Sequence, residues 1–478
     1  MAKFFKYKTL DMLREDVERL GVGVRLEDEL RACLEPLEIG GRTVGNRFAI
    51  HPMEGCDAEL DGKPGELTIR RWERFGAGGA KLIWGEATAV ADEVRANTRQ
   101  LLINEDNLAS LADMLERTRK AHRDSVGDDS DLLIGLQLTH SGRYSYKGPL
   151  IAQHDSAVDA VTIADKKKRL FVTDEYPILT DDELRIAGDL IVEGARLSAK
   201  IGFDFVDIKQ CHRYLLSELL AARMRPGAYG GSYENRTRLA REIIGQVKDE
   251  LGDRLIIATR LNVYDGAPFF QDPDTGAGSP KEVETPYLGG WGTNPDNPLE
   301  PDYAEPVQYV RDMEKWGVQL LNISMGSPYY NPHVGRPFER PPIDGYTSPE
   351  HPLLGVERHF EAAAVMQAAV PNVPVIGTGY SWLQHYFANA GEANLRDGRV
   401  SMIGVGRGSL AYPDFAKDAM ANGELARTKA CVAVSYCTAL MRAKHNDMGQ
   451  YPTGCVPRDK PYADIYKHAL ATDPARNS

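Results

Sequence analysis

A single (β/α)8 barrel is the fold that the sequence predicts, and two patterns indicate it. Eight short runs rich in Ile, Val and Leu recur along the chain, and amphipathic stretches separate most of them. The runs are apolar on both faces, as strands of a parallel sheet must be when helices cover it. Eightfold alternation of strand and helix favours a closed barrel over an open doubly wound sheet. The predicted strands are Phe48–His51, Lys81–Glu86, Leu132–Leu138, Phe205–Ile208, Leu255–Arg260, Gln319–Ser324, Val373–Gly377 and Val400–Gly404.

Two of the predicted helices have clear boundaries. Thr180-Asp181-Asp182-Glu183 has the spacing of a capping box, which opens a helix that runs to about Lys200. A second helix is expected from Glu234 to Leu251, with Gly252 as its C-terminal cap.

Three segments lie outside the repeat. The barrel is expected over residues 35–423, with residues 1–34 as an N-terminal extension that contains a helix over Asp11–Leu20, and residues 424–478 as a C-terminal tail. The loop after the fifth strand, residues 264–301, is rich in Gly, Pro and Asp and carries four spaced aromatic residues. Such a long loop predicts a lid, and a disordered insertion is the alternative.

The bulk composition limits the class of partner. The chain has 57 basic and 69 acidic residues, a net charge of −12, which argues against nucleic acids and anionic membranes as partners. No apolar run is long enough to cross a membrane, and the charged segment Met1–Leu20 lacks the apolar core of a secretory signal. Six cysteines in 478 residues do not form a disulfide framework, so a cytoplasmic enzyme acting on a small molecule is expected, as a homo-oligomer.

Polar residues follow most of the predicted strands, where the active site of such a barrel forms. Strands 1 to 6 end in His51-Pro52-Met53, Glu86-Ala87-Thr88, Gln137-Leu138-Thr139-His140, Lys209 to Tyr214, Arg260-Leu261-Asn262 and Ser324 to Ser327. Strands 7 and 8 end in Gly377-Thr378-Gly379 and Gly404-Val405-Gly406-Arg407, where glycines allow backbone N–H groups to approach a phosphate. A phosphate-bearing cofactor is therefore predicted, although polar barrel rims also occur without function.

Several motifs, in this order, resemble the Old Yellow Enzyme family of FMN-dependent NAD(P)H:flavin oxidoreductases. The most specific is Tyr229-Gly230-Gly231-Ser232-Tyr233-Glu234-Asn235-Arg236, and further matches are Asn46-Arg47-Phe48, Pro52-Met53, Glu86 to Val90, Gln137 to Arg143, and Gly406-Arg407. The resemblance implies FMN as cofactor and NADH or NADPH as reductant. It places Pro52, Met53 and Ala87 along the flavin ring, Gln137 at its pyrimidine edge, Arg260 near N1 and O2, and Gly379, Gly406 and Arg407 at the phosphate.

The same resemblance places the catalytic residues at Lys209, His212 and Tyr214. Ene-reductases of the family carry a His-x-x-His or His-x-x-Asn pair that holds the substrate carbonyl, followed by a tyrosine that protonates the α-carbon. Here Lys209 replaces the first histidine, which makes anionic substrates more plausible, because an ammonium can pair with a carboxylate. The alternative is that Lys209 turns away toward a buried glutamate.

Two further segments resemble parts of family subgroups. Tyr329, Tyr330 and His333 follow the sixth strand and are expected to cover the substrate pocket, or else to form a proline-stiffened rim. In the tail, Cys431, Cys437 and Cys455 lie where members similar to 2,4-dienoyl-CoA reductase and trimethylamine dehydrogenase bind an iron–sulfur cluster. Val434 replaces the fourth ligand, so the tail is interpreted as a remnant without cluster or metal.

The predicted function is NAD(P)H-driven reduction of an activated C=C bond through FMN, with Tyr214 as the proton donor. The alternative from the same resemblance is an amine dehydrogenase or N-demethylase that passes electrons to a partner. A third hypothesis is a non-catalytic flavin-binding barrel, for which Tyr214 would be dispensable.

Overall fold

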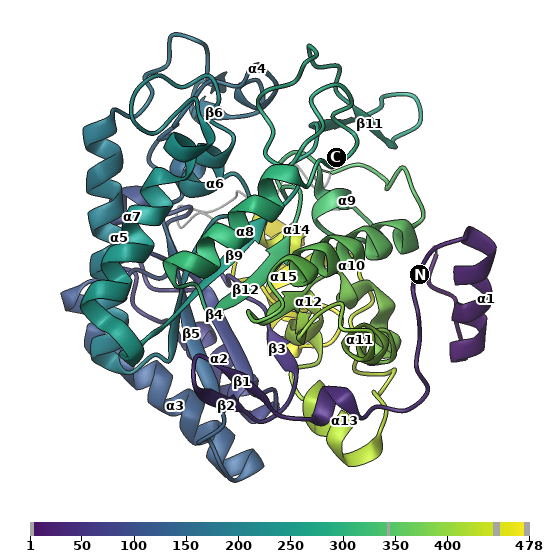
Figure 1. Cartoon of the computed structure of the whole chain (residues 1–478). Coiled ribbons are helices and arrows are strands. Elements are labelled where there is room, and N and C mark those ends of the chain that lie inside the picture. Colours follow the sequence, from purple (N-terminus) through teal and green to yellow (C-terminus); the bar gives the residue numbers. More distant parts are fainter. Residues whose placement is uncertain (1–3, 342–344, 443–449, 473–478) are drawn as a thin grey trace.

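The computed structural model describes residues 4–341, 345–442 and 450–472, and its centre is a closed parallel barrel (Figure 1). Each strand pairs in parallel with its neighbours around the ring β12-β13-β14-β3-β4-β5-β8-β9. The predicted (β/α)8 fold is therefore confirmed. The barrel strands are β3 (Phe48–Ile50), β4 (Leu82–Ala89), β5 (Leu133–Thr139), β8 (Phe205–Ile208), β9 (Ile256–Asn262), β12 (Leu320–Ser324), β13 (Val375–Gly377) and β14 (Met402–Val405).

A helix follows each strand and packs on the outside of the ring (Figure 1). The two helices with predicted boundaries form as expected. Thr180 and Glu183 make the reciprocal capping box of α5 (Asp181–Ile201), and α7 (Tyr233–Leu251) has Gly252 as its C-terminal cap. The outer helices are α2 (Glu66–Ala77), α3 (Leu108–Val126), α5 (Asp181–Ile201), α7 (Tyr233–Leu251), α8 (Ala304–Trp316), α10 (Pro352–Ala369), α11 (Phe387–Arg396) and α13 (Phe415–Asn422). Short helices in the connecting loops are α4 (Ser156–Asp159), α6 (Leu215–Leu220), α9 (Pro332–Gly335) and α12 (Arg407–Ala411).

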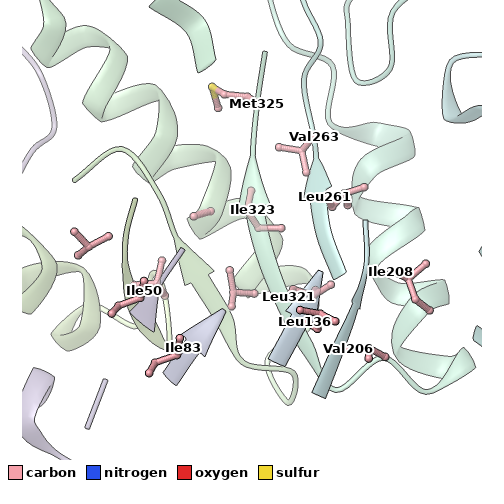
Figure 2. Packing of buried hydrophobic residues seen from close by; sticks show 14 of the residues in the cluster. Ile50, Ile83, Leu136, Val206, Ile208, Leu261, Val263, Leu321, Ile323 and Met325 are labelled. Atoms are coloured by element: carbon pink, nitrogen blue, oxygen red, sulfur yellow. The ribbon is translucent and has the colours of Figure 1, made fainter. Parts of the chain in front are cut away.

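Alternate residues of each strand belong to two separate apolar clusters. Outward residues, among them Ile50, Ile83, Leu136, Val206 and Leu321, join the cluster that contains the helices (Figure 2). The opposite faces form an inner cluster closed from below by the hairpin of β1 (Leu37–Ile39) and β2 (Arg42–Val44). That inner cluster contains Ala49, Leu82, Trp84, Leu133, Phe205, Ile256, Ala258, Leu320, Ile376 and Met402.

The inward face changes from apolar to polar toward the carboxyl ends of the strands. Because side chains alternate with a period of two, Gln137 follows Leu133 on the inner face, Lys209 follows Phe205, and Arg260 follows Ile256. The lower half of the barrel is therefore a packed core, whereas the upper half gathers polar side chains at one end.

The N-terminal extension lies beside the loops after β12 and β13. Its helix α1 (Leu10–Leu20) has the position predicted for Asp11–Leu20. The backbone N–H groups of Phe4 and Phe5 donate to the carboxylate of Glu339 at 2.7 and 2.9 Å, and the Phe5 ring packs against Trp382. These contacts attach the extension to the barrel.

The segment 264–301 folds into the rim of the barrel. It begins with a hairpin of β10 (Phe269–Gln271) and β11 (Gly278–Pro280), and its Trp291 is buried against Tyr309 of α8 with ring centroids 5.7 Å apart. Tyr287 and Trp291 are therefore used in internal packing, whereas Phe270 is exposed, and the lid stays a prediction. A second small hairpin, β6 (Ile163–Asp165) with β7 (Leu170–Phe171), lies in the loop after β5.

The C-terminal tail packs against α2 and the loop after β3. Its described helices are α14 (Tyr436–Arg442) and α15 (Lys460–Thr472). Asp459 accepts two hydrogen bonds of 2.9 Å from Arg70 on α2, and the Thr453 N–H donates to the carbonyl of Gly55 at 2.7 Å. Within the described ranges, no helix combines the length and the apolar character needed to span a membrane.

Candidate active site

A cavity of about 210 Å³ opens at the polar end of the barrel. All eight barrel strands or the loops after them reach it, and the tail closes one side through α14 and Thr453. The lining includes Lys209, His212, Tyr214, Pro52, Met53, Ala87, Gln137, Arg260, Gly379, Gly406, Arg407 and Tyr329 from the sequence prediction, together with His51, Glu54, Arg336, Cys437, Met441 and Arg442. The predicted catalytic and cofactor residues therefore share one pocket.

Asp207 organises the floor of this pocket. Its carboxylate accepts hydrogen bonds from the Trp84 indole N–H at 2.8 Å, from the backbone N–H of Arg260 at 2.7 Å and from the side-chain amide of Gln137. Because the amide NH₂ of Gln137 is turned to Asp207, its carbonyl oxygen is left as an acceptor toward the pocket. That acceptor suits the N3–H group of a flavin pyrimidine edge.

Two guanidinium groups in the pocket are suited to an anionic ligand. The Nε of Arg260 is buried without a hydrogen-bond partner, and neither Arg260 nor Arg407 forms an ion pair within the described part of the chain. Burial lowers the pKa of Arg407, and the nearby Arg260 and Arg442 lower it further. A phosphate and an electron-rich ring edge would compensate these charges, so the residues fit FMN.

Glycines and His51 shape the end of the pocket formed after β3, β13 and β14. Gly379 has φ +91°, a conformation that a side chain would strain, and a Cβ there would collide with His359. His51 accepts a 2.8 Å hydrogen bond from Asn322 at Nδ1, and burial holds its pKa well below the usual range. His51 is therefore a neutral wall residue.

Lys209, His212 and Tyr214 converge on the opposite side of the pocket. The Lys209 ammonium lies 3.8 Å from the centroid of the Tyr214 ring, and no carboxylate among the described residues pairs with it. The glutamate pairing considered as an alternative is thus not formed. Burial lowers the pKa of Lys209 and places that of His212 well below its usual value, so His212 is neutral at physiological pH.

A buried ion cluster holds the loop that carries these three residues. Arg213 donates to Asp155 at 2.8 Å and to Asp265 at 3.0 Å, and both acids are almost completely buried. The same acids accept hydrogen bonds from Tyr287 and from the backbone of Trp291 in the 264–301 segment. We call Arg213, Asp155 and Asp265 the Arg213 clasp; it joins the loops that follow β5, β8 and β9.

Tyr144, Tyr329 and Tyr214 form a stack of rings, and the Tyr214 ring faces Lys209. The rings of Tyr144 and Tyr329 are parallel with centroids 3.7 Å apart, and the Tyr214 hydroxyl lies 2.9 Å from that of Tyr329. Of the residues expected to cover the pocket, Tyr329 lines it, whereas Tyr330 and His333 are absent from its described lining. His333 instead bonds the Tyr346 hydroxyl at 2.6 Å.

Glu54 is a pocket residue to which the sequence assigned no role. Its carboxylate accepts a hydrogen bond from the Asn97 side chain and faces the same cavity as Lys209 and Tyr214. Removal from bulk water raises the pKa of Glu54 to about 7, although Lys209 lowers it. The only local signal was a glutamate directly after Pro52-Met53 at the end of a barrel strand.

The tail cysteines lie beside Arg407, which also lines the main pocket. Cys431, Cys437 and Cys455 line a second, smaller cavity together with Arg407, and all six cysteines of the chain are free thiols. Within the ranges that the structure describes, no group of His, Cys, Asp or Glu side chains is arranged to hold a metal ion. Helix α14 of the tail supplies Met441 and Arg442 to the main pocket, which the sequence did not predict.

The barrel and its pocket suit an FMN-dependent oxidoreductase, and comparison with known proteins supports this class. Residues 33–272 match the model of the NADH:flavin oxidoreductase / NADH oxidase family, and the chain belongs to this family. The chain is 29% identical over 306 residues to the NADPH dehydrogenase of Geobacillus sp. (strain WCH70), covering 61% of this chain and 72% of that protein. It is thus an enzyme that uses FMN and takes electrons from NAD(P)H.

Solved structures show the same fold. Morphinone reductase in complex with tetrahydroNAD aligns with a TM-score of 0.58 at 20% identity, covering 85% of this chain and 96% of that one. The 2-naphthoyl-CoA reductase complex aligns with a TM-score of 0.65 at 16% identity, covering 93% of this chain. The present chain spans 58% of the length of that reductase.

The raised pKa of Glu54 predicts how stability depends on pH. In the folded chain the pKa of Glu54 is about 7, against 4.5 for an ordinary glutamate. Because the folded state holds this proton more tightly than the unfolded state, the contribution of Glu54 to the free energy of unfolding falls as pH rises between these two values. Outside this range the contribution does not change with pH. Glu54→Gln cannot lose the proton. In thermal melts of the FMN-loaded proteins, the Tm of E54Q relative to wild type should rise by roughly a few degrees between about pH 5 and about pH 8. A constant difference in Tm would contradict the assignment.

Proposed function

We propose that the enzyme reduces the activated C=C bond of an α,β-unsaturated carbonyl compound or acid. The observation that carries the proposal is the convergence of an ammonium, a neutral imidazole and a buried phenol on the pocket that suits FMN. These are two groups able to hold a carbonyl or carboxylate oxygen and one group able to give a proton. When bound, FMN supplies the hydride.

Each residue has a distinct task in this proposal. Lys209 and His212 hold the substrate oxygen and stabilise the negative charge that develops on it. Tyr214 gives a proton to the α-carbon. Gln137, Arg260 and Arg407 hold the cofactor. Pro52, Met53, Ala87, Gly379 and Gly406 shape the walls against which the cofactor rests.

The charge of the pocket supports an anionic substrate. Arg260 and Arg407 are assigned to the cofactor, and Lys209, Arg336 and Arg442 line the cavity in addition. Glu54 is the carboxylate that opposes them, and its pKa of about 7 leaves it only partly charged near neutral pH. An unsaturated carboxylate would compensate this surplus of positive charge.

For oxidation of an amine, the alternative function, one observation is favourable and another is unfavourable. The tyrosine stack and Glu54 are groups that could surround a cationic amine. However, the Lys209 ammonium already lies against the Tyr214 ring, and a second cation there would be repelled. Bleaching of the bound flavin by NAD(P)H followed by reoxidation with an enone supports C=C reduction. Bleaching by a methylated amine, with no reoxidation of the reduced flavin by an enone, would refute C=C reduction.

We also propose that the enzyme works in a reducing compartment such as the cytoplasm, on a freely diffusing substrate and as a homo-oligomer. The six free thiols support the first part of this proposal. Analytical ultracentrifugation of the purified enzyme measures the oligomeric state.

Removing the proton donor should slow only one half-reaction. In Tyr214→Phe the phenol is lost, so stopped-flow reoxidation of the reduced enzyme by an unsaturated acid should slow by about 100-fold or more. Reduction of the same variant by NADPH does not use this proton and should keep its rate, which serves as the internal control. Reoxidation at the wild-type rate would exclude Tyr214 as the donor.

Lys209 should determine the preference for acids. In Lys209→Gln the amide still donates a hydrogen bond but carries no charge, so the ratio of kcat/KM for an unsaturated acid to kcat/KM for the matching methyl ketone should fall about tenfold. Steady-state assays with the two substrates measure this ratio. If both values of kcat/KM fall equally, the anionic substrate is refuted.

A further inference from the structure

The proton donor Tyr214 does not stand alone in the pocket. Its hydroxyl oxygen lies 2.9 Å from that of Tyr329, a hydrogen-bond distance in which either oxygen can be the donor. The two residues differ in burial, since Tyr214 is 4% exposed and Tyr329 is 40% exposed. A buried phenol is therefore linked directly to the phenol of a partly exposed residue, whose own pKa is raised by burial.

Tyr214 needs such a partner on chemical grounds. Burial raises the pKa of Tyr214 well above 10, and the nearby Tyr329 and Glu54 raise it further. A phenol of this kind is a weak acid, and the phenolate left after it gives up a proton is costly in a buried site. A hydroxyl that turns to donate to the phenolate oxygen reduces this cost, because hydrogen bonds to charged groups are the strong ones.

The position of Tyr329 is well determined by its surroundings. Its ring stacks on Tyr144, and its backbone N–H donates to the Ser327 hydroxyl at 3.3 Å. The Ser327 N–H donates to Asn331 at 2.6 Å, and Asn331 in turn donates to the carbonyl of Asp265 in the Arg213 clasp at 2.7 Å. The loop that carries Tyr329 is thus tied to the residues that hold Tyr214.

We propose that Tyr214 and Tyr329 form a two-hydroxyl proton relay, and that Tyr329 returns to Tyr214 the proton that the substrate takes. The inference rests on the proposed C=C reduction. In the step, the Tyr214 O–H bond breaks as a C–H bond forms at the carbanion-like α-carbon, and the Tyr329 proton moves to the Tyr214 oxygen. Tyr329 then takes a proton from water, so the net reaction consumes one hydride from NAD(P)H and one solvent proton.

The test uses Tyr329→Phe in the FMN-loaded enzyme, with Tyr144→Phe as the matched control. The control removes the hydroxyl of Tyr144, whose ring belongs to the same stack. That hydroxyl takes no part in the hydrogen bond between Tyr214 and Tyr329. Single-turnover reoxidation by an unsaturated acid should slow about tenfold in Y329F, and stay near the wild-type rate in Y144F. Reduction by NADPH should be unchanged in both variants.

A proton inventory separates a relay from a purely structural role. In mixtures of H₂O and D₂O, the reoxidation rate of the wild-type enzyme should follow a curve that indicates two moving protons, and that of Y329F a straight line. A straight line for the wild-type enzyme would overturn the relay without any variant, and so would an unchanged curve in Y329F. Failure of the proposed function is distinguishable, because the reduced wild-type enzyme would then not be reoxidised by the acid at all.

Discussion

The ion cluster of Arg213 with Asp155 and Asp265 is the constraint on which the geometry of the site depends. Arg213 lies between His212 and Tyr214, and both His212 and Arg213 have left-handed backbone conformations with φ +62° and +59°. Such conformations cost about 1–2 kcal/mol per residue and need support from the surrounding structure. The Arg213 clasp supplies it, because removing one partner from a buried ion pair costs about 3–5 kcal/mol.

The clasp also explains how loops that are distant in sequence form one pocket wall. Asp155 comes from the loop after β5 and Asp265 from the loop after β9, and the two acids also fasten the 264–301 segment through Tyr287 and Trp291. Asn331 connects the Tyr329 loop to Asp265. The side of the pocket that contains Tyr214 is therefore held by buried charges, whereas the opposite side is shaped by the strand ends, glycines and Asp207.

The parts that sequence predicted well are those encoded locally. The strands are continuous apolar runs, the capping box at Thr180 lies within four residues, and Lys209, His212 and Tyr214 are neighbours in one loop. The clasp was missed because Asp155 lies 58 residues before Arg213 and Asp265 lies 52 residues after it, and no local pattern marks such pairs. For the same reason the sequence did not reveal that Met441 and Arg442 of the tail reach the pocket, or that Tyr330 and His333 are absent from its described lining.

We propose that the clasp positions Tyr214 for proton transfer, and single-turnover kinetics of Arg213→Lys measure this most directly. Lysine keeps the buried charge but cannot bridge both acids with a rigid fork. The variant should bind FMN and be reduced by NADPH at nearly the wild-type rate, while its reoxidation by an unsaturated acid slows on the order of tenfold, because misplaced reacting groups lose rate steeply. Reoxidation at the wild-type rate in the folded, FMN-loaded variant would contradict the claim.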